Sequence, residues 1–152
     1  MDADALAELA RLAGDGSARL YVTACDLDCV SGIAEPDYEL PLQIGFGDGE
    51  VRLTLKDGRG EMRLPVPPQA THFAADSAPL AEAMPVALYS ETRLGGVIAA
   101  TGIFADAEGA EARLVLAGRG NQCWAAGGIS HWLLDVAGPR AGFRLFGRLA
   151  AR

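Results

Sequence analysis

The residue types best suited to ligand contact are concentrated in one short stretch of the sequence. Residues 121–132 contain both tryptophans, one of the two histidines and two side-chain amides. Aromatic rings flanked by amides are a common way for β-sheet proteins to hold sugars and other small polar ligands. The alternative is that a tryptophan of this stretch belongs to the core. The predicted ligand-binding residues are Asn121, Gln122, Trp124, His131 and Trp132.

A second cluster of functional groups is acidic. Residues 26–39 carry five carboxylates and no basic side chain. Such a loop has enough oxygen atoms for Ca²⁺, which takes about six to eight of them. The spacing opens like an EF-hand, but Val30 and Ser31 stand where a ligand and the turn glycine belong, which favours a solvated acidic loop instead. The candidate calcium ligands are Asp26, Asp28, Asp37 and Glu39, and no other cofactor is expected.

The three cysteines, Cys25, Cys29 and Cys123, are an odd number, so they cannot form a fully paired disulfide framework. Cys25 and Cys29 have a spacing found in zinc sites, but Cys123 and His131 are too far apart to complete one. A thiol enzyme would need a cysteine beside a histidine, and no nucleophile motif accompanies these residues. We expect the cysteines to be buried as small apolar side chains.

The charge is unevenly distributed along the chain. The formal net charge is −7, and the acidic excess lies entirely within the first 76 residues. An acidic chain repels the phosphate backbone, so we expect no nucleic-acid partner. In the basic C-terminal segment, Arg144 and Arg148 would share the solvent face of a strand. They are candidates for contact with a protein partner, or for protection of an exposed sheet edge.

The positions of apolar residues predict a chain of short strands. Apolar and polar residues alternate over residues 39–66, with interruptions at Gly47-Asp48-Gly49 and Asp57-Gly58. This pattern predicts a three-stranded antiparallel meander. Apolar residues at helical spacing predict a short helix over residues 2–13, and Gly95-Gly96 predicts a turn. Further strands are expected at 18–25, 85–91, 95–105, 111–117, 128–136 and 142–149. The predicted fold class is all-β, an antiparallel β-sandwich or jelly roll forming a single domain over residues 1–152.

These patterns predict a binding protein more readily than an enzyme. The acidic N-terminal residues and the lack of a long apolar run predict a cytoplasmic protein without a membrane partner, although a subunit of a larger particle would have the same features. The expected function is a non-catalytic binding or assembly module that contacts a protein partner or associates with itself. The alternative is a small-molecule or carbohydrate-binding sandwich, with Ca²⁺ at the acidic loop, and a small thiol enzyme is the third interpretation.

Overall fold

The computed structural model describes residues 9, 11–14, 18–22, 38–67, 70–76, 87–119 and 128–151. In these parts of the chain the regular elements are β-strands and one turn of 3₁₀ helix (Ala105–Ala107), which confirms the all-β prediction. The strands are β1 (Leu12–Gly14), β2 (Ala18–Val22), β3 (Tyr38–Leu40), β4 (Leu42–Gly47), β5 (Glu50–Leu55), β6 (Gly60–Pro65), β7 (Thr71–Asp76), β8 (Ala87–Val97), β9 (Ala99–Gly102), β10 (Glu111–Arg119), β11 (His131–Ala137) and β12 (Gly142–Ala151).

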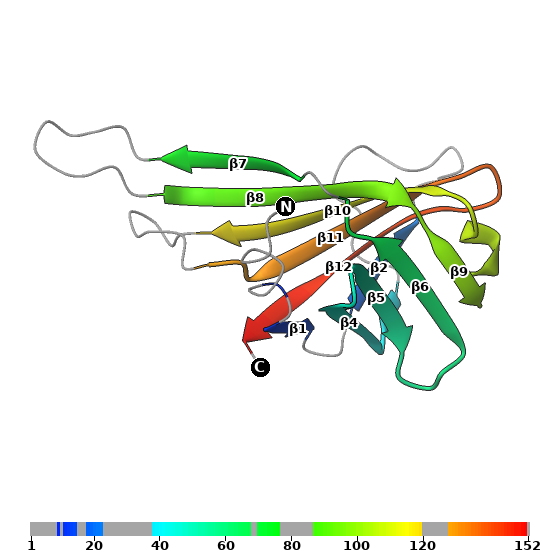
Figure 1. Cartoon of the computed structure of the whole chain (residues 1–152). Helices are drawn as coiled ribbons and strands as arrows, with labels where there is room; N and C mark the ends of the chain where they lie inside the picture. Colours follow the sequence, from blue (N-terminus) through cyan, green and yellow to red (C-terminus); the bar gives the residue numbers. More distant parts are fainter. Residues whose placement is uncertain are drawn as a thin grey trace, which may run out of the picture.

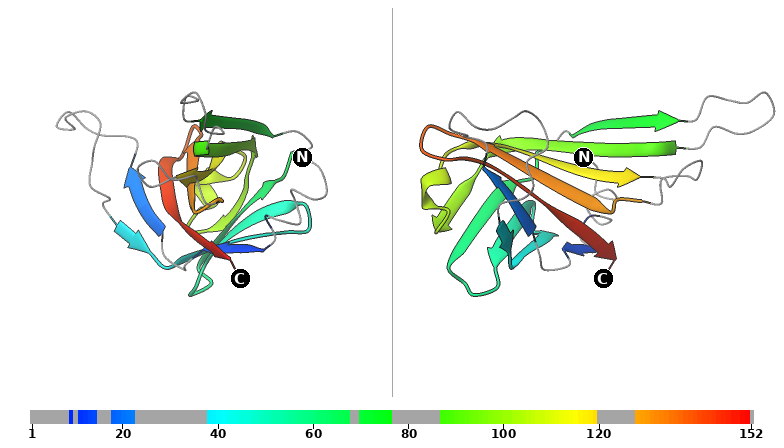
Figure 2. Two further views of the ribbon diagram at one scale, coloured as in Figure 1. Left: turned by 90° about the vertical axis from the view of Figure 1, so that its left-hand side faces the viewer. Right: turned by 180° about the vertical axis from the view of Figure 1, so that it is seen from behind.

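The strands form two antiparallel sheets that face each other, as the sandwich prediction requires (Figure 1). The larger sheet contains β7, β8, β10, β11, β12, β2 and β3, and the smaller sheet contains β1, β4, β5, β6 and β9. The sheets are joined at two places, because β12 pairs with β2 and then with β1, and because β9 follows β8 after a single residue. Two further views show how these long strands pass from one sheet to the other (Figure 2).

The predicted meander is present as β4, β5 and β6. Ile44 lies opposite Leu53, and Leu53 lies opposite Met62, so the apolar side chains of the three strands face the core together. Both turns have the left-handed backbone expected for tight hairpins, with φ of 52° at Asp48, 74° at Gly49 and 73° at Gly58. The period-two pattern and the turn residues therefore located these elements correctly.

The short N-terminal helix predicted for residues 2–13 is not seen. Leu12–Gly14 form β1, which lies between β12 and β4 and helps to join the two sheets, while residues 1–8 and 10 lie outside the described residues. Leucine and alanine favour a helix by intrinsic propensity, but here two neighbouring strands pair with the segment, so tertiary pairing overrides the local pattern. The described residues contain no helix long and apolar enough to cross a lipid bilayer.

The turn predicted at Gly95-Gly96 is also wrong, because both glycines lie inside β8. The predicted strands at 85–91 and 95–105 are therefore one long strand followed by the short β9. A Cβ atom on Gly96 would lie 3.3 Å from Leu64 Cδ1 of β6. The glycine thus lets β8 approach the smaller sheet closely, at the point where the chain crosses from one sheet to the other.

A row of completely buried leucines crosses the larger sheet. Each leucine lies directly opposite the next one on the neighbouring strand, and all of them point toward the smaller sheet. Because side chains alternate along a strand, this row fixes which residues of each strand face outward. The leucines are Leu94, Leu114, Leu134 and Leu145.

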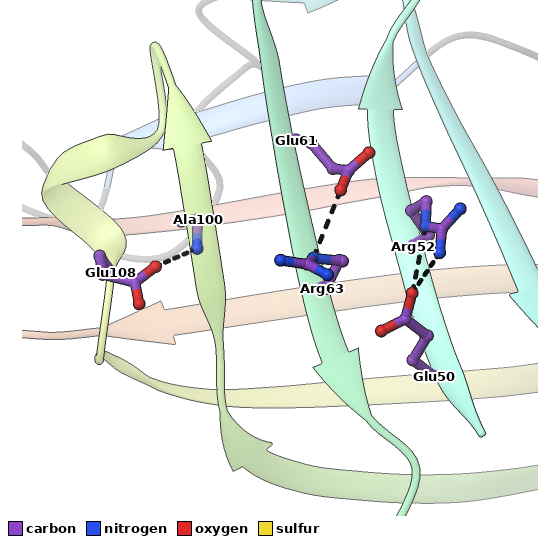
Figure 3. A network of polar contacts seen from close by, with 6 residues as sticks. All are labelled: Glu50, Arg52, Glu61, Arg63, Ala100 and Glu108. Carbon is purple, nitrogen blue, oxygen red and sulfur yellow. Dashed lines mark hydrogen bonds and ion pairs between the residues drawn. The ribbon is translucent and has the colours of Figure 1, made fainter. Parts of the chain in front are cut away.

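One open sheet edge is closed by a side chain. The carboxylate of Glu108, which follows the 3₁₀ turn, accepts a hydrogen bond from the backbone N–H of Ala100 in β9 (Figure 3). Backbone hydrogen bonds between Ile98 and residues 109 and 110 hold this turn beside the end of β9. An edge whose backbone donors are already engaged cannot accept another strand.

The leucine row gives a direct test of the register. Leu114→Ala should lower the free energy of unfolding by about 2–5 kcal/mol, because it leaves a cavity in a packed core. Val115→Ala, one residue further along β10 on the opposite face, should have a clearly smaller effect because Val115 is only partly buried. Urea denaturation measures both values. Equal losses for the two variants would contradict the assignment of inner and outer faces.

Candidate binding surface

The outer face of the larger sheet, which points away from the core, carries a second row of apolar side chains. Val115 lies opposite Leu133, and Leu133 lies opposite Phe146, so the row crosses β10, β11 and β12. All three residues are partly buried although they face away from the core. They line a hollow of about 550 Å³, together with Tyr89 and Glu91 of β8 and with His131. An apolar floor with a few polar groups is typical of a binding site.

Glu91 is the one buried charged residue of the described chain, with 7% of its surface exposed. The Tyr89 hydroxyl donates a hydrogen bond of 2.6 Å to its Oε2 atom, and Arg93 forms an ion pair with Oε1. The hydrogen bond from Tyr89 lowers the pKa of Glu91 most, and the hydrogen bond and charge of Arg93 lower it further. Together they outweigh the desolvation that would raise the pKa. Glu91 is therefore a fixed negative charge at one end of the hollow.

Along one side of the apolar row, two arginines share one carboxylate. Arg113 Nη2 lies 3.5 Å from Asp135 Oδ2, and Arg144 Nη2 lies 2.8 Å from the same oxygen. The three residues stand side by side on β10, β11 and β12. The Nε atom of Arg144 is buried, and no described residue accepts its hydrogen bond. Among the described residues, Asp135 is the one carboxylate within ion-pair distance of these two guanidinium groups.

The other side of the apolar row is formed by His131 and Arg148, which lie opposite each other on β11 and β12. His131 Nδ1 is 2.8 Å from Ser130 Oγ. Both His131 and Arg148 are exposed, and no described residue forms an ion pair with Arg148. The apolar row is thus bordered by four arginines and two carboxylates in a protein whose net charge is −7. We call the four arginines the basic rim: Arg93, Arg113, Arg144 and Arg148.

The structure brings together residues that the sequence had assigned to two different sites. His131 was a predicted ligand residue, Arg144 and Arg148 were predicted protein contacts, and all three lie on the outer face of the larger sheet. Trp132 is buried, with 2% of its surface exposed, and packs against Gly147. A Cβ atom on Gly147 would lie 2.6 Å from the indole Nε1 atom, and no described residue accepts a hydrogen bond from that nitrogen. The other predicted ligand residues, Asn121, Gln122 and Trp124, lie outside the described residues.

The calcium prediction falls largely outside the described residues as well. Asp26, Asp28 and Asp37 are not described, and Glu39 belongs to β3, where its backbone lies opposite Arg19 of β2. Within the described ranges, no three His, Cys, Asp or Glu side chains gather closely enough to hold a metal ion. Cys25, Cys29 and Cys123 are also outside these ranges, so the thiol-enzyme interpretation stays a prediction.

A second hollow, of about 510 Å³, lies on the outer face of the smaller sheet. Its floor contains Gly45 and Gly47 of β4, and its polar wall contains Glu50 and Arg52 of β5. Those two charged side chains form an ion pair with each other (Figure 3). With Asp48, the lining has an excess of carboxylates and no apolar row, so the hollow of the larger sheet is the better candidate for an acidic ligand.

Little in the sequence indicates that Glu91, Tyr89 and the apolar row lie on one candidate site. Glu91 and Arg93 are one of several pairs in which an acidic residue precedes an arginine by two positions; others are Glu50 with Arg52 and Glu61 with Arg63. Within a strand such pairs point to the same side and form ion pairs. This recurring spacing is the sequence pattern from which the Glu91–Arg93 ion pair could have been predicted. The burial of Glu91 depends on neighbouring strands and has no local signature.

Comparisons with known proteins add no family to this description. No protein-family model, no curated protein and no solved structure matches the chain.

The buried carboxylate predicts a specific acid sensitivity. Because the folded pKa of Glu91 lies below its ordinary value of 4.5, its contribution to stability is complete above pH 4.5 and is lost as the pH falls through the lowered pKa. Glu91→Gln should therefore lose less free energy of unfolding than the wild-type protein between pH 6 and about pH 3. Tyr89→Phe, which removes the strongest hydrogen bond to the carboxylate, should also flatten the profile. Denaturant unfolding at a series of pH values measures this, and indistinguishable profiles for wild type and Glu91→Gln would contradict it.

Proposed function

We propose that this protein is a non-catalytic binding module that holds an extended acidic segment of a partner protein on the outer face of its larger sheet. The observation that carries the proposal is the apolar row of Val115, Leu133 and Phe146, bordered by the basic rim. A cytoplasmic location belongs to the same proposal and is supported by the odd number of cysteines.

Charge supports an acidic partner. The protein as a whole repels anions, yet the sides of the apolar row carry more arginines than carboxylates. Arg148 has no ion pair with a described residue, and Arg144 shares the carboxylate of Asp135 with Arg113. Complementary charge at the rim of an apolar contact raises association rates and excludes partners of the wrong sign.

The geometry of β12 indicates the spacing of the partner residues. Arg144, Phe146 and Arg148 alternate along the strand, so their side chains point to the same side. At about 3.4 Å per residue, the two arginines are separated by about 14 Å along the strand, with the phenyl ring between them. An extended segment matches this arrangement when it has an apolar residue, one acidic residue two positions before it and another two positions after it.

A binding role also agrees with the state of Glu91. Its carboxylate accepts a hydrogen bond from Tyr89 and pairs with Arg93, which stabilises the charged form. Its lowered pKa keeps it a weak base. The residue is better suited to orient Arg93 at the end of the apolar row than to remove a proton.

A small amphipathic anion is the second candidate occupant. The hollow of about 550 Å³ falls within the range of small-molecule sites. The predicted carbohydrate surface would also use this region through His131, with Asn121, Gln122 and Trp124 contributing from outside the described residues. A peptide is favoured because the charged groups are spread along the length of a strand.

A short labelled peptide tests the proposal. A peptide with the sequence Glu-Ser-Leu-Ser-Glu, blocked at both ends, should bind the full-length protein at about 20 mM salt and more weakly at about 500 mM, where charge interactions are screened. A peptide with glutamine in place of both glutamates should bind clearly more weakly. Fluorescence anisotropy measures both affinities.

Variants locate the contact. Arg148→Gln and Arg144→Gln should each weaken binding of the glutamate peptide by about two- to fivefold, as expected for exposed ion pairs. Arg59→Gln is the matched control, because Arg59 is an exposed arginine on the β5–β6 turn of the smaller sheet and pairs only with nearby Asp57. Equal binding of the two peptides, no binding at low salt, or the same loss in Arg59→Gln would overturn the proposal. Binding of a simple aliphatic carboxylate with the same variant profile, but not of the peptide, would assign the surface to a small ligand.

A further inference from the structure

The strand β7 lies at the outer edge of the larger sheet and pairs on one side only. Its described partner is β8, with Phe73 opposite Glu91, and no described residue pairs with its other side. Figures 1 and 2 show β7 and β8 extending beyond the rest of the sandwich, with β7 outermost. An edge of this kind presents a row of backbone donors and acceptors to another strand.

The described side chains of β7 are those of residues 71–73, and they are exposed on both faces of the strand. Thr71 and Phe73 point to the outer face and His72 to the inner face, and all three are exposed. Phe73 has 52% of its surface exposed and contacts Tyr89, with ring centroids 6.3 Å apart. A large apolar side chain this exposed on an edge strand is a candidate contact for another chain.

The charge pattern of β7 favours a second copy of the same chain. Residues 71–75 carry no carboxylate, lysine or arginine, although the net charge of the protein is −7. The neighbouring charges on β8, Glu91 and Arg93, neutralise each other. Two copies would therefore meet here with little electrostatic repulsion, whereas a strongly charged partner would find no counter-charge on the strand.

The contrast with β9, a free edge of the smaller sheet, supports the same conclusion. At β9 the backbone N–H of Ala100 is occupied by the Glu108 carboxylate. Natural proteins protect free edges with charges, prolines or covering side chains. On β7 the described residues include none of these before Asp76.

We propose that two copies of this protein associate by antiparallel pairing of their β7 strands around a two-fold axis at Phe73. Each Phe73 then lies directly opposite its symmetry mate. His72 pairs with the partner's Ala74, and Thr71 pairs with the partner's Ala75. The larger sheets join into one continuous sheet, which is the self-complementary geometry of a two-fold dimer.

Aromatic contact adds to the backbone pairing. In this register the two Phe73 rings are cross-strand neighbours, and each continues to contact its own Tyr89. Cross-strand aromatic pairs contribute beyond the area that they bury. The dimer leaves Arg144, Phe146 and Arg148 accessible, because β10 and β11 separate β8 from β12.

Sedimentation velocity of the full-length protein tests the proposal. The wild-type protein should sediment as a concentration-dependent dimer at both about 20 mM and about 500 mM salt, because backbone and apolar contacts are not screened. Phe73→Lys should weaken the dimer at least tenfold. Phe73→Tyr, which keeps the ring, should retain it.

The chain supplies matched controls. Ile103 and Val97 are exposed apolar residues outside β7, with 55% and 57% of their surface exposed, so Ile103→Lys and Val97→Lys should leave the dimer unchanged. Circular dichroism confirms that each variant is folded. A monomeric wild type, a dimer lost in high salt, or a dimer that survives Phe73→Lys would overturn the proposal. Peptide binding by Ile103→Lys should equal that of the wild type, and a wild-type protein that binds the peptide as a monomer, or that dimerises without binding it, keeps failure of the dimer and failure of the proposed function as separate results.

Discussion

The alternation of side chains across the larger sheet is the constraint on which the rest of the structure depends. Four leucines lie opposite one another across β8, β10, β11 and β12 and are completely buried. Since a shift of one residue would expose every one of these leucines to water, the register is strongly fixed. The same register turns Val115, Leu133 and Phe146 outward, so the core determines the composition of the candidate binding surface.

Ion pairs determine how charge is distributed over the two sheets. On the smaller sheet, Arg52 and Arg63 each pair with an acidic residue two positions earlier (Figure 3), and Arg59 on the turn does the same with Asp57. On the larger sheet Arg113 instead reaches across to Asp135, which Arg144 also contacts. Positive charge is therefore balanced locally on one face of the sandwich and remains in excess on the other, close to an apolar row.

The sequence predicted local structure well where pairing partners are adjacent in the chain. The meander was correct because Asp48, Gly49 and Gly58 set its turns and the apolar period sets its faces. The errors arose where distant strands decide the outcome. Leu12 and Ala13 form a strand between β12 and β4, and Gly95-Gly96 lies within a strand that crosses between the sheets. For the candidate site, the sequence predicts roles for His131, Arg144 and Arg148 one by one, but their proximity and the burial of Glu91 follow from long-range pairing that no local pattern encodes.

The central claim is that the outer face of the larger sheet is the surface that binds a partner. Chemical-shift mapping of the ¹⁵N-labelled protein with the glutamate-containing peptide tests it most directly, because it reports every backbone amide at once. The account predicts that the largest shifts occur at Val115, Leu133, Phe146 and the residues beside them, with little change on β4, β5 and β6. Shifts centred on the hollow of the smaller sheet around Gly45 and Arg52, or spread evenly over the molecule, would contradict it.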